Sequence, residues 1–186
     1  MEKELGQKAS DCVKIVLYGP ESSGKTSLCK DLARHYNTAW VPEYMRTYLE
    51  AKLENNQGLI EKGDLLPIAR GQISDENKKA AINKLLFCDT DLLQLEVYAR
   101  YYYDGYCPEP IAQAAQANTY PLYLLCDIDI PWEPDPLRDR PFDRKTLFRI
   151  FKAKLDDNRR SYQLISGDRK HRVQQAVAAV ENLLNP

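Results

Sequence analysis

The stretch that decides the fold is Val13-Lys14-Ile15-Val16-Leu17-Tyr18-Gly19-Pro20-Glu21-Ser22-Ser23-Gly24-Lys25-Thr26. Residues 13–18 form a β-rich run, which predicts a buried strand, and the pattern from Lys25 to His35 predicts a helix. Between them, residues 19–26 match Gly-x-x-x-x-Gly-Lys-[Ser/Thr]. A strand, this loop and a helix in succession predict a P-loop, a site for the phosphates of a nucleoside triphosphate.

Each part of the loop has a predicted role in holding the nucleotide and Mg²⁺. Lys25 neutralises the β and γ phosphates, the Thr26 hydroxyl is a ligand of Mg²⁺, and Gly24 lets the backbone approach closely. A glycine turn that merely caps a helix would leave the lysine and the threonine unexplained. The predicted nucleotide-binding residues here are Gly19, Glu21, Ser22, Ser23, Gly24, Lys25, Thr26 and Ser27.

The rest of the chain alternates short apolar runs with helical patterns. Further strands are expected at residues 39–41, 85–88, 120–126 and 162–165, and helices at 92–103 and 172–184. Such alternation predicts an α/β P-loop NTPase with a parallel five-stranded sheet, order 2-3-1-4-5, flanked by helices. We expect one domain over 12–186 after a polar N-terminal tail, 1–11. The proline-rich stretch 131–136 predicts a mobile lid over about 131–160.

A second metal ligand is expected at the end of the strand predicted for residues 85–88. This strand delivers Asp89 to the carboxyl edge of the sheet, where open α/β folds bind ligands, with Asp91 nearby. Asp89 is therefore predicted to position Mg²⁺ together with Thr26. The alternative is that Asp89 caps the helix that begins near Leu92, and the two roles are compatible.

Composition and charge exclude several classes of function. The 186 residues include 26 Lys and Arg against 27 Asp and Glu, so no large net charge attracts nucleic acid or a membrane. The five cysteines form no Cys-x-x-Cys pair, which favours reduced thiols and a cytoplasmic protein. No run of eighteen apolar residues occurs, so a membrane span is not expected. The sequence does not indicate an oligomeric state.

Two features favour ATP-dependent phosphoryl transfer over a GTPase switch. No Asn/Thr-Lys-x-Asp element, which reads guanine in regulatory GTPases, occurs late in the chain. A cationic segment after the proline-rich stretch contains Arg138 and Arg140, which are suited to neutralising charge in the transition state. The alternative for this segment is a solvated loop held by Arg–Asp pairs.

An acceptor site is expected beside the second strand. Glu43 and Arg46 follow it closely, and Glu43 can accept a proton from an acceptor hydroxyl. The alternative is that Glu43 begins a helix and pairs with Arg46 three residues on. Of the aromatic residues in the same neighbourhood, Tyr44, Tyr98 and Trp132 are candidates for holding a flat or cationic ring of a small-molecule substrate.

Three motifs together resemble a known family. Gly-x-Glu-Ser-Ser-Gly-Lys at 19–25, Glu-Tyr-x-Arg at 43–46 and Phe-Cys-Asp-Thr-Asp at 87–91 resemble the nicotinamide riboside kinase domain of the NadR proteins. The resemblance extends from about Cys12 onward and also covers residues 166–172, a region that lies beside adenine in related P-loop kinases. It therefore implies a contact between Arg169 and the nucleotide.

The resemblance implies an activity as well as a site. It implies ATP-dependent phosphorylation of the ribose 5′-hydroxyl of nicotinamide riboside, giving nicotinamide mononucleotide for NAD synthesis. Lys25, Glu43, Asp89, Arg138 and Arg140 would take part in catalysis, and Asp91 would lie beside the substrate with Arg46. NadR proteins join this domain to a nucleotidyltransferase and often to a DNA-binding module, and we expect neither within these 186 residues. Two alternatives stay open: a kinase for another nucleoside or small alcohol, and an ATP-binding switch that is not a kinase.

Overall fold

Five short strands form one sheet, and all of their pairings are parallel. The computed structural model describes residues 4–133 and 142–185. The strands lie in the order β2-β3-β1-β4-β5, which confirms the predicted fold class and strand order. Their bounds are β1 (Val13–Tyr18), β2 (Ala39–Val41), β3 (Leu85–Asp89), β4 (Leu122–Cys126) and β5 (Tyr162–Ile165).

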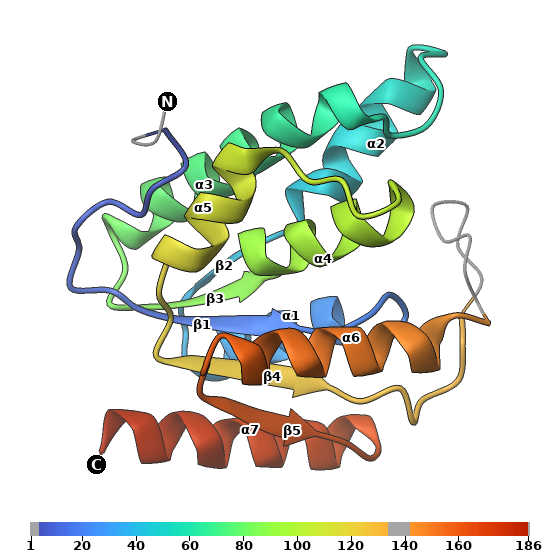
Figure 1. Ribbon diagram of the computed structural model, residues 1–186. Helices are drawn as coiled ribbons and strands as arrows, with labels where there is room; N and C mark the ends of the chain where they lie inside the picture. The colour runs from blue at the N-terminus through green and yellow to red at the C-terminus, as the bar shows by residue number, and fades with distance from the viewer. Residues whose placement is uncertain (1–3, 134–141, 186) are drawn as a thin grey trace.

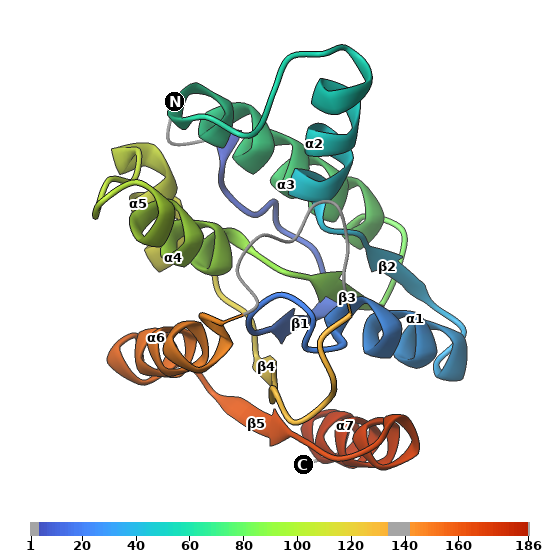
Figure 2. The same cartoon turned by 90° about the vertical axis from the view of Figure 1, so that its right-hand side faces the viewer.

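Helices connect successive strands and cover both faces of the sheet (Figures 1 and 2). A short 3₁₀ helix, η2 (Lys62–Asp64), precedes α3. The α-helices are α1 (Lys25–His35), α2 (Tyr44–Glu54), α3 (Leu65–Ala80), α4 (Leu92–Tyr102), α5 (Glu109–Ala117), α6 (Arg144–Asp157) and α7 (Arg169–Leu184). The sequence did not predict α5, and α7 begins three residues before the predicted start.

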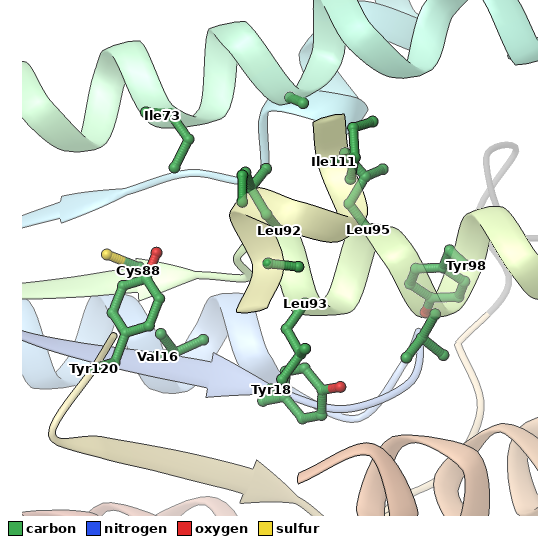
Figure 3. Packing of buried hydrophobic residues seen from close by; sticks show 14 of the residues in the cluster. Val16, Tyr18, Ile73, Cys88, Leu92, Leu93, Leu95, Tyr98, Ile111 and Tyr120 are labelled. Carbon is green, nitrogen blue, oxygen red and sulfur yellow. The ribbon is translucent and has the colours of Figure 1, made fainter. Parts of the chain in front are cut away.

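Alternate residues of the central strand face two separate cores. Ile15 and Leu17 of β1 pack with α1 and α7 on one face of the sheet. Val16 and Tyr18 point to the other face, where α3, α4, α5 and α6 cover the sheet. Figure 3 shows this second core, in which Tyr18 lies between β1 and α4. A strand that is buried on both faces needs mostly apolar residues, and the one charged residue of β1, Lys14, is buried in an ion pair with Glu76.

The N-terminal segment that the sequence indicated as a polar tail packs against the domain. Leu5 is buried in the core between α3 and α5. Asn118 Nδ2 donates a hydrogen bond to the carbonyl of Leu5, and Gln7 Nε2 donates to Glu76 Oε1. Residues 4–11 therefore lie across the end of the domain, although they form no strand or α-helix.

The second half of the region predicted as a lid is a helix packed on the sheet. Leu147, Phe151 and Leu155 of α6 are fully buried. Phe151 meets the ring of Tyr18 edge to face, with ring centroids 5.0 Å apart. Residues 134–141, which include Arg138 and Arg140, lie outside the described residues. Across the ranges that the structure describes, no helix is both long and apolar enough to span a membrane.

Candidate functional site

The P-loop has the backbone geometry that its glycines predict. Gly19 has a φ of +137°, and a Cβ there would lie 2.9 Å from the carbonyl oxygen of Cys126. Gly24 has a φ of +82° and caps α1 in the left-handed conformation without a side-chain hydrogen bond. The first N–H groups of α1 therefore have no capping side chain, and they point into the loop as an anion site requires.

Several side chains hold the loop in this shape. Ser23 Oγ donates to the carbonyl of Pro20, and Lys25 Nζ donates to the same oxygen at 2.9 Å. Arg172 donates to the carbonyl of Ser23, and Arg144 donates to that of Ser22, both at 2.9 Å. The loop is thus preformed, and the ammonium group of Lys25 lies within the concave site.

Thr26 and Asp89 bring two oxygen donors together at the edge of the loop. Thr26 Oγ1 donates to Asp89 Oδ2 at 2.5 Å. Asp89 is the last residue of β3 and pairs in register with Leu17 of β1, which brings it beside the P-loop. Burial raises the pKa of Asp89, while Lys25 and the hydroxyl of Thr26 oppose the rise.

The second oxygen of this carboxylate fits a metal or its water. Asp89 Oδ1 is buried and accepts no hydrogen bond from the residues that the structure describes. A hydroxyl and a carboxylate are the hard oxygen donors that Mg²⁺ prefers, and a triphosphate supplies further oxygens. The described residues contain no cluster of three or more His, Cys, Asp or Glu side chains that could hold a metal alone. The pair therefore fits Mg²⁺ that arrives with a nucleotide.

One cavity of about 590 Å³ joins the P-loop to an aromatic end. Lys25 and Thr26 of the P-loop line it, and the side chains of Tyr98, Tyr102 and Tyr103 line it as well. This volume is within the range of small-molecule sites. It is large enough for a phosphate chain and a second small molecule to meet.

Glu43 is one of the carboxylates that line the cavity. It follows β2 and lines the cavity together with Arg46. Burial, reinforced by the nearby Asp89 carboxylate, raises the pKa of Glu43 to about 7, against the opposing charges of Lys25 and Arg46. A carboxylate with this pKa is suited to accept a proton near neutral pH.

Comparison with known proteins places the chain in a family. Residues 14–172 match the profile of a family described as AAA domain. The chain belongs to this AAA domain family. It is also 32% identical over 149 residues to the trifunctional NAD biosynthesis/regulator protein NadR of Escherichia coli strain K12, which confirms the resemblance seen in the sequence. That match covers 77% of this chain, and the chain spans 36% of the length of the curated relatives that it matches.

Solved structures share the fold of this AAA domain. A crystal structure of a NadR protein in complex with NR superposes with a TM-score of 0.76 at 20% identity, over 94% of this chain and 51% of that chain. A deoxyadenosine kinase from M. mycoides superposes with a TM-score of 0.68 at 11% identity, over 91% of this chain and 100% of that one. The architecture is therefore that of P-loop kinases.

Most of the site residues predicted from the sequence lie around the large cavity of the AAA domain. Asp89 lies directly behind Thr26, and Gly19 shapes the loop. The predicted residues that line the cavity are Glu21, Ser22, Ser23, Gly24, Lys25, Thr26, Ser27, Glu43, Arg46, Tyr98 and Arg169. Arg169 also forms a bidentate pair with Asp31 of α1, with both N–O distances at 2.7 Å.

Three predicted substrate contacts lie elsewhere. Asp91 is buried below α4, where Oδ1 accepts from the backbone N–H of Gln94 and Oδ2 accepts from the hydroxyl of Tyr123. Tyr44 packs its ring against Gly71 of α3. Trp132 lies under the guanidinium group of Arg144, 5.8 Å from its ring centroid. Asp91 thus caps a helix, and the two aromatic side chains pack against protein groups.

Sequence reasoning missed the apolar wall of the cavity. Met45 and Leu49 of α2, and Leu59 and Ile60 before η2, line it beside the tyrosines. The hydroxyl of Tyr103 donates to the carbonyl of Ile60 at 2.7 Å and holds this segment in place. The signal in the sequence was a few apolar residues spaced along an otherwise polar segment. The same spacing occurs on the buried side of any surface helix, so it did not indicate a cavity wall.

Proposed function

We propose that this chain is a kinase that transfers the γ-phosphoryl group of Mg·ATP to the ribose 5′-hydroxyl of nicotinamide riboside, giving nicotinamide mononucleotide. The observation that carries the proposal is that Lys25 of the P-loop and Glu43, with its pKa near 7, line one cavity. A phosphoryl donor and an alcohol acceptor need this combination of a phosphate cradle and a proton acceptor.

The chemical step uses the protein groups in defined roles. Glu43 accepts the proton of the acceptor hydroxyl, the hydroxyl oxygen forms a bond to the γ-phosphorus, and the bond from that phosphorus to the ADP oxygen breaks. Lys25 and the loop N–H groups stabilise the charge that spreads over the phosphoryl oxygens. Thr26 and Asp89 would hold Mg²⁺, which neutralises charge on the β and γ phosphates when it is bound.

The aromatic end of the cavity supports a flat, cationic acceptor. Tyr98, Tyr102 and Tyr103 line this cavity together with the Glu43 carboxylate. Aromatic faces and a carboxylate attract a pyridinium ring through its positive charge. The relatives support the same choice, because one is named for NAD biosynthesis and another was crystallised with NR. The five free thiols fit a reducing, cytoplasmic compartment.

The test is ADP release from Mg·ATP by the purified chain, measured alone and with nicotinamide riboside, uridine, thymidine or shikimate as acceptor. We expect turnover only with nicotinamide riboside and a product with the mass of nicotinamide mononucleotide. Lys25→Ala is expected to abolish this turnover, because the γ-phosphate loses its fixed cation. Turnover with another of these acceptors would identify that compound as the substrate in place of nicotinamide riboside. Slow hydrolysis of ATP that is independent of any acceptor would favour an ATP switch.

A further inference from the structure

Two buried glutamine side chains lie next to the proposed catalytic base and take no part in the chemistry described above. Gln72 of α3 is 4% exposed, and Gln94 of α4 is 1% exposed. The amide oxygen of Gln72 accepts a hydrogen bond from the backbone N–H of Tyr44 at 2.8 Å. The amide oxygen of Gln94 accepts one from the N–H of Gly19 at 3.2 Å. Because a backbone N–H must face an oxygen, both amides have a fixed orientation.

This orientation leaves the two amide nitrogens without acceptors. Among the described residues, neither Gln72 Nε2 nor Gln94 Nε2 has a hydrogen-bond partner, and both atoms are buried. A buried N–H group that lacks an acceptor is costly, and native proteins usually satisfy such groups with a side chain, a backbone carbonyl or an ordered water. Two such donors on neighbouring helices point to a shared acceptor.

Both glutamines line the same small void, which lies between α3 and α4. Its volume is about 10 Å³, close to the minimum for one water molecule. Leu92 and Leu95 also line it, and Figure 3 shows these two side chains on α4, on the side of that helix near α3. A void of this size that is bordered by two hydrogen-bond donors is polar enough to hold water.

A carboxylate faces the void from the side of the active site. Glu43 lines both this void and the large cavity, as do Met45, Leu95 and Tyr98. Asp91 also borders the void, but its two oxygens already accept bonds from Gln94 N and the Tyr123 hydroxyl. A water molecule that accepts bonds from both amides retains two protons to donate. Of the two carboxylates that line the void, Glu43 is the one left to accept a bond from this water.

We propose that one ordered water molecule occupies this void, accepts hydrogen bonds from Gln72 Nε2 and Gln94 Nε2, and donates one to the Glu43 carboxylate. Gln72 and Gln94 are then positioning residues for Glu43. The assignment of this role rests on the proposed kinase function, whereas the water site itself does not. Since the same amides also hold Tyr44 N and Gly19 N, the water joins the start of α2 to the start of the P-loop.

The first test is a crystal structure of the wild-type protein that resolves ordered water. We expect a water peak at about 2.7–3.2 Å from both amide nitrogens and from a carboxylate oxygen of Glu43. An empty void, or amides that bond to another group, would overturn the water site. This measurement needs no turnover, so it separates a failure of the water site from a failure of the proposed function.

The second test asks whether the water acts through Glu43. Gln72→Met and Gln94→Met keep side-chain length and remove the amide donor. We expect each to lose the water peak and to lower kcat about tenfold, with a smaller change in the KM for ATP. Gln72→Met is informative even if loss of the Gly19 contact prevents Gln94→Met from folding.

A double-mutant cycle with Glu43→Gln distinguishes positioning from a general structural effect. Once Glu43 is replaced, removal of Gln72 should reduce kcat far less than it does in the wild type, because both changes act on the same group. Equal reductions in both backgrounds would overturn the positioning role. Gln113→Met, on the exposed side of α5, is the matched control and should leave kcat and the water peak unchanged.

Discussion

The hydroxyl of Thr26 donates a 2.5 Å hydrogen bond to Asp89 and joins the first turn of α1 to the last residue of β3. This contact uses one carboxylate oxygen and leaves Oδ1 without a partner among the described residues. It brings two of the oxygen ligands proposed for Mg²⁺ together. The metal dependence of the proposed reaction should therefore be sensitive to Asp89.

Asp89→Asn removes the negative charge but keeps the size of this side chain. We expect kcat to fall about 10²–10³-fold and the Mg²⁺ concentration for half-maximal rate to rise, because a charged ligand of the metal is lost. A Mg²⁺ titration of the steady-state rate measures both effects. Unchanged kcat and unchanged Mg²⁺ dependence would argue against a metal site here.

Asp91→Asn is the matched comparison, two residues further on. Its two carboxylate oxygens accept from the N–H of Gln94 and the hydroxyl of Tyr123, and an asparagine amide has one oxygen to accept them, so the change should lower the free energy of unfolding by about 1 kcal/mol. We expect the Mg²⁺ concentration for half-maximal rate to stay at the wild-type value. An equal shift in both variants would mean that charge near the sheet edge, and not ligation by Asp89, sets the metal dependence.

The raised pKa of Glu43 predicts a pH dependence of the rate. With its pKa at about 7, Glu43 is a carboxylate, and therefore a base, only above neutral pH. We expect kcat/KM to fall about tenfold per pH unit below this value and to level off above it. In Glu43→Gln this acid limb should disappear, with the plateau lowered about 10²–10⁴-fold. If Glu43→Gln kept the same fall in kcat/KM at acid pH as the wild type, that pH dependence would belong to another group.

The same pKa shift predicts an effect of pH on the free energy of unfolding. A salt-bridged acid stabilises the folded state at neutral pH, whereas the ionised Glu43 carboxylate should destabilise it. Because folding raises the pKa of Glu43 from 4.5 to about 7, the folded state disfavours the carboxylate. The protein should lose stability as pH rises from about 4.5 to about 7, and nothing further is lost above this range. Glu43→Gln avoids this loss, so it should be more stable than the wild type at pH ~8 by on the order of 1–3 kcal/mol.

Thermal unfolding at acid and alkaline pH checks this stability effect. The difference in Tm between Glu43→Gln and wild type should be small near pH ~4 and largest near pH ~8. Glu54→Gln, at the exposed end of α2, should stay within about 0.5 kcal/mol of wild type. A Glu43→Gln protein that is less stable than wild type at alkaline pH would show that its carboxylate is stabilised in the fold.

The sequence predicted those parts of the molecule that depend on local pattern. The loop around Gly19 and Gly24 needs glycine at specific backbone conformations, and the five strands are short runs of mostly apolar residues. The sheet order followed from the P-loop and was confirmed. Short helix α5 was missed, because nine residues rich in alanine give a weak periodic signal.

The acceptor wall and the glutamine pair could not be predicted for a different physical reason. Helix α2 contains no buried residue: Met45 and Leu49 line the cavity, and Met45 is only partly buried where it packs against the core. Gln72 and Gln94 are polar residues on helices, and the sequence pattern alone predicts that such side chains are exposed to solvent. Their burial depends on contacts with Tyr44 and Gly19, which are distant in sequence.

Gly71→Ala tests whether the position of α2 matters for the acceptor site. A Cβ at Gly71 would lie 2.1 Å from a ring carbon of Tyr44, so α2 or its tyrosine must move. Alanine favours the helix over glycine by about 1 kcal/mol, but overpacking of this size costs about 1–3 kcal/mol. The net effect on the free energy of unfolding should therefore be destabilising. We expect a lower Tm and a raised KM for the acceptor, measured by thermal unfolding and steady-state kinetics.

Gly63→Ala is the control for that change. No heavy atom lies within 4 Å of a Cβ at this position in η2, within the part of the chain that the structure describes. We expect it to be neutral, or stabilising by a few tenths of a kcal/mol through the unfolded state. If Gly71→Ala were equally neutral, the contact between Tyr44 and Gly71 would not determine where α2 lies.

Arg172 links three backbone segments around the nucleotide side of the cavity. Its guanidinium group donates to the carbonyls of Ser23, Gly167 and Asp127 at 2.8–3.0 Å and also pairs with Asp129. A lysine at this position keeps the charge but has one nitrogen, which cannot reach three carbonyls in different directions. Arg172→Lys should therefore lower the free energy of unfolding by about 2–4 kcal/mol and raise the KM for ATP more than it lowers kcat.

Arg169→Lys separates this effect from the general loss of an arginine. Arg169 pairs with Asp31 on the protein surface, where ion pairs contribute less than about 1 kcal/mol. Chemical denaturation of both variants should therefore place Arg172→Lys well below Arg169→Lys in stability. Equal stability of the two would mean that the three carbonyls are satisfied by water when Arg172 is lost. In that case the P-loop would keep its shape without Arg172, and the KM for ATP should stay at its wild-type value.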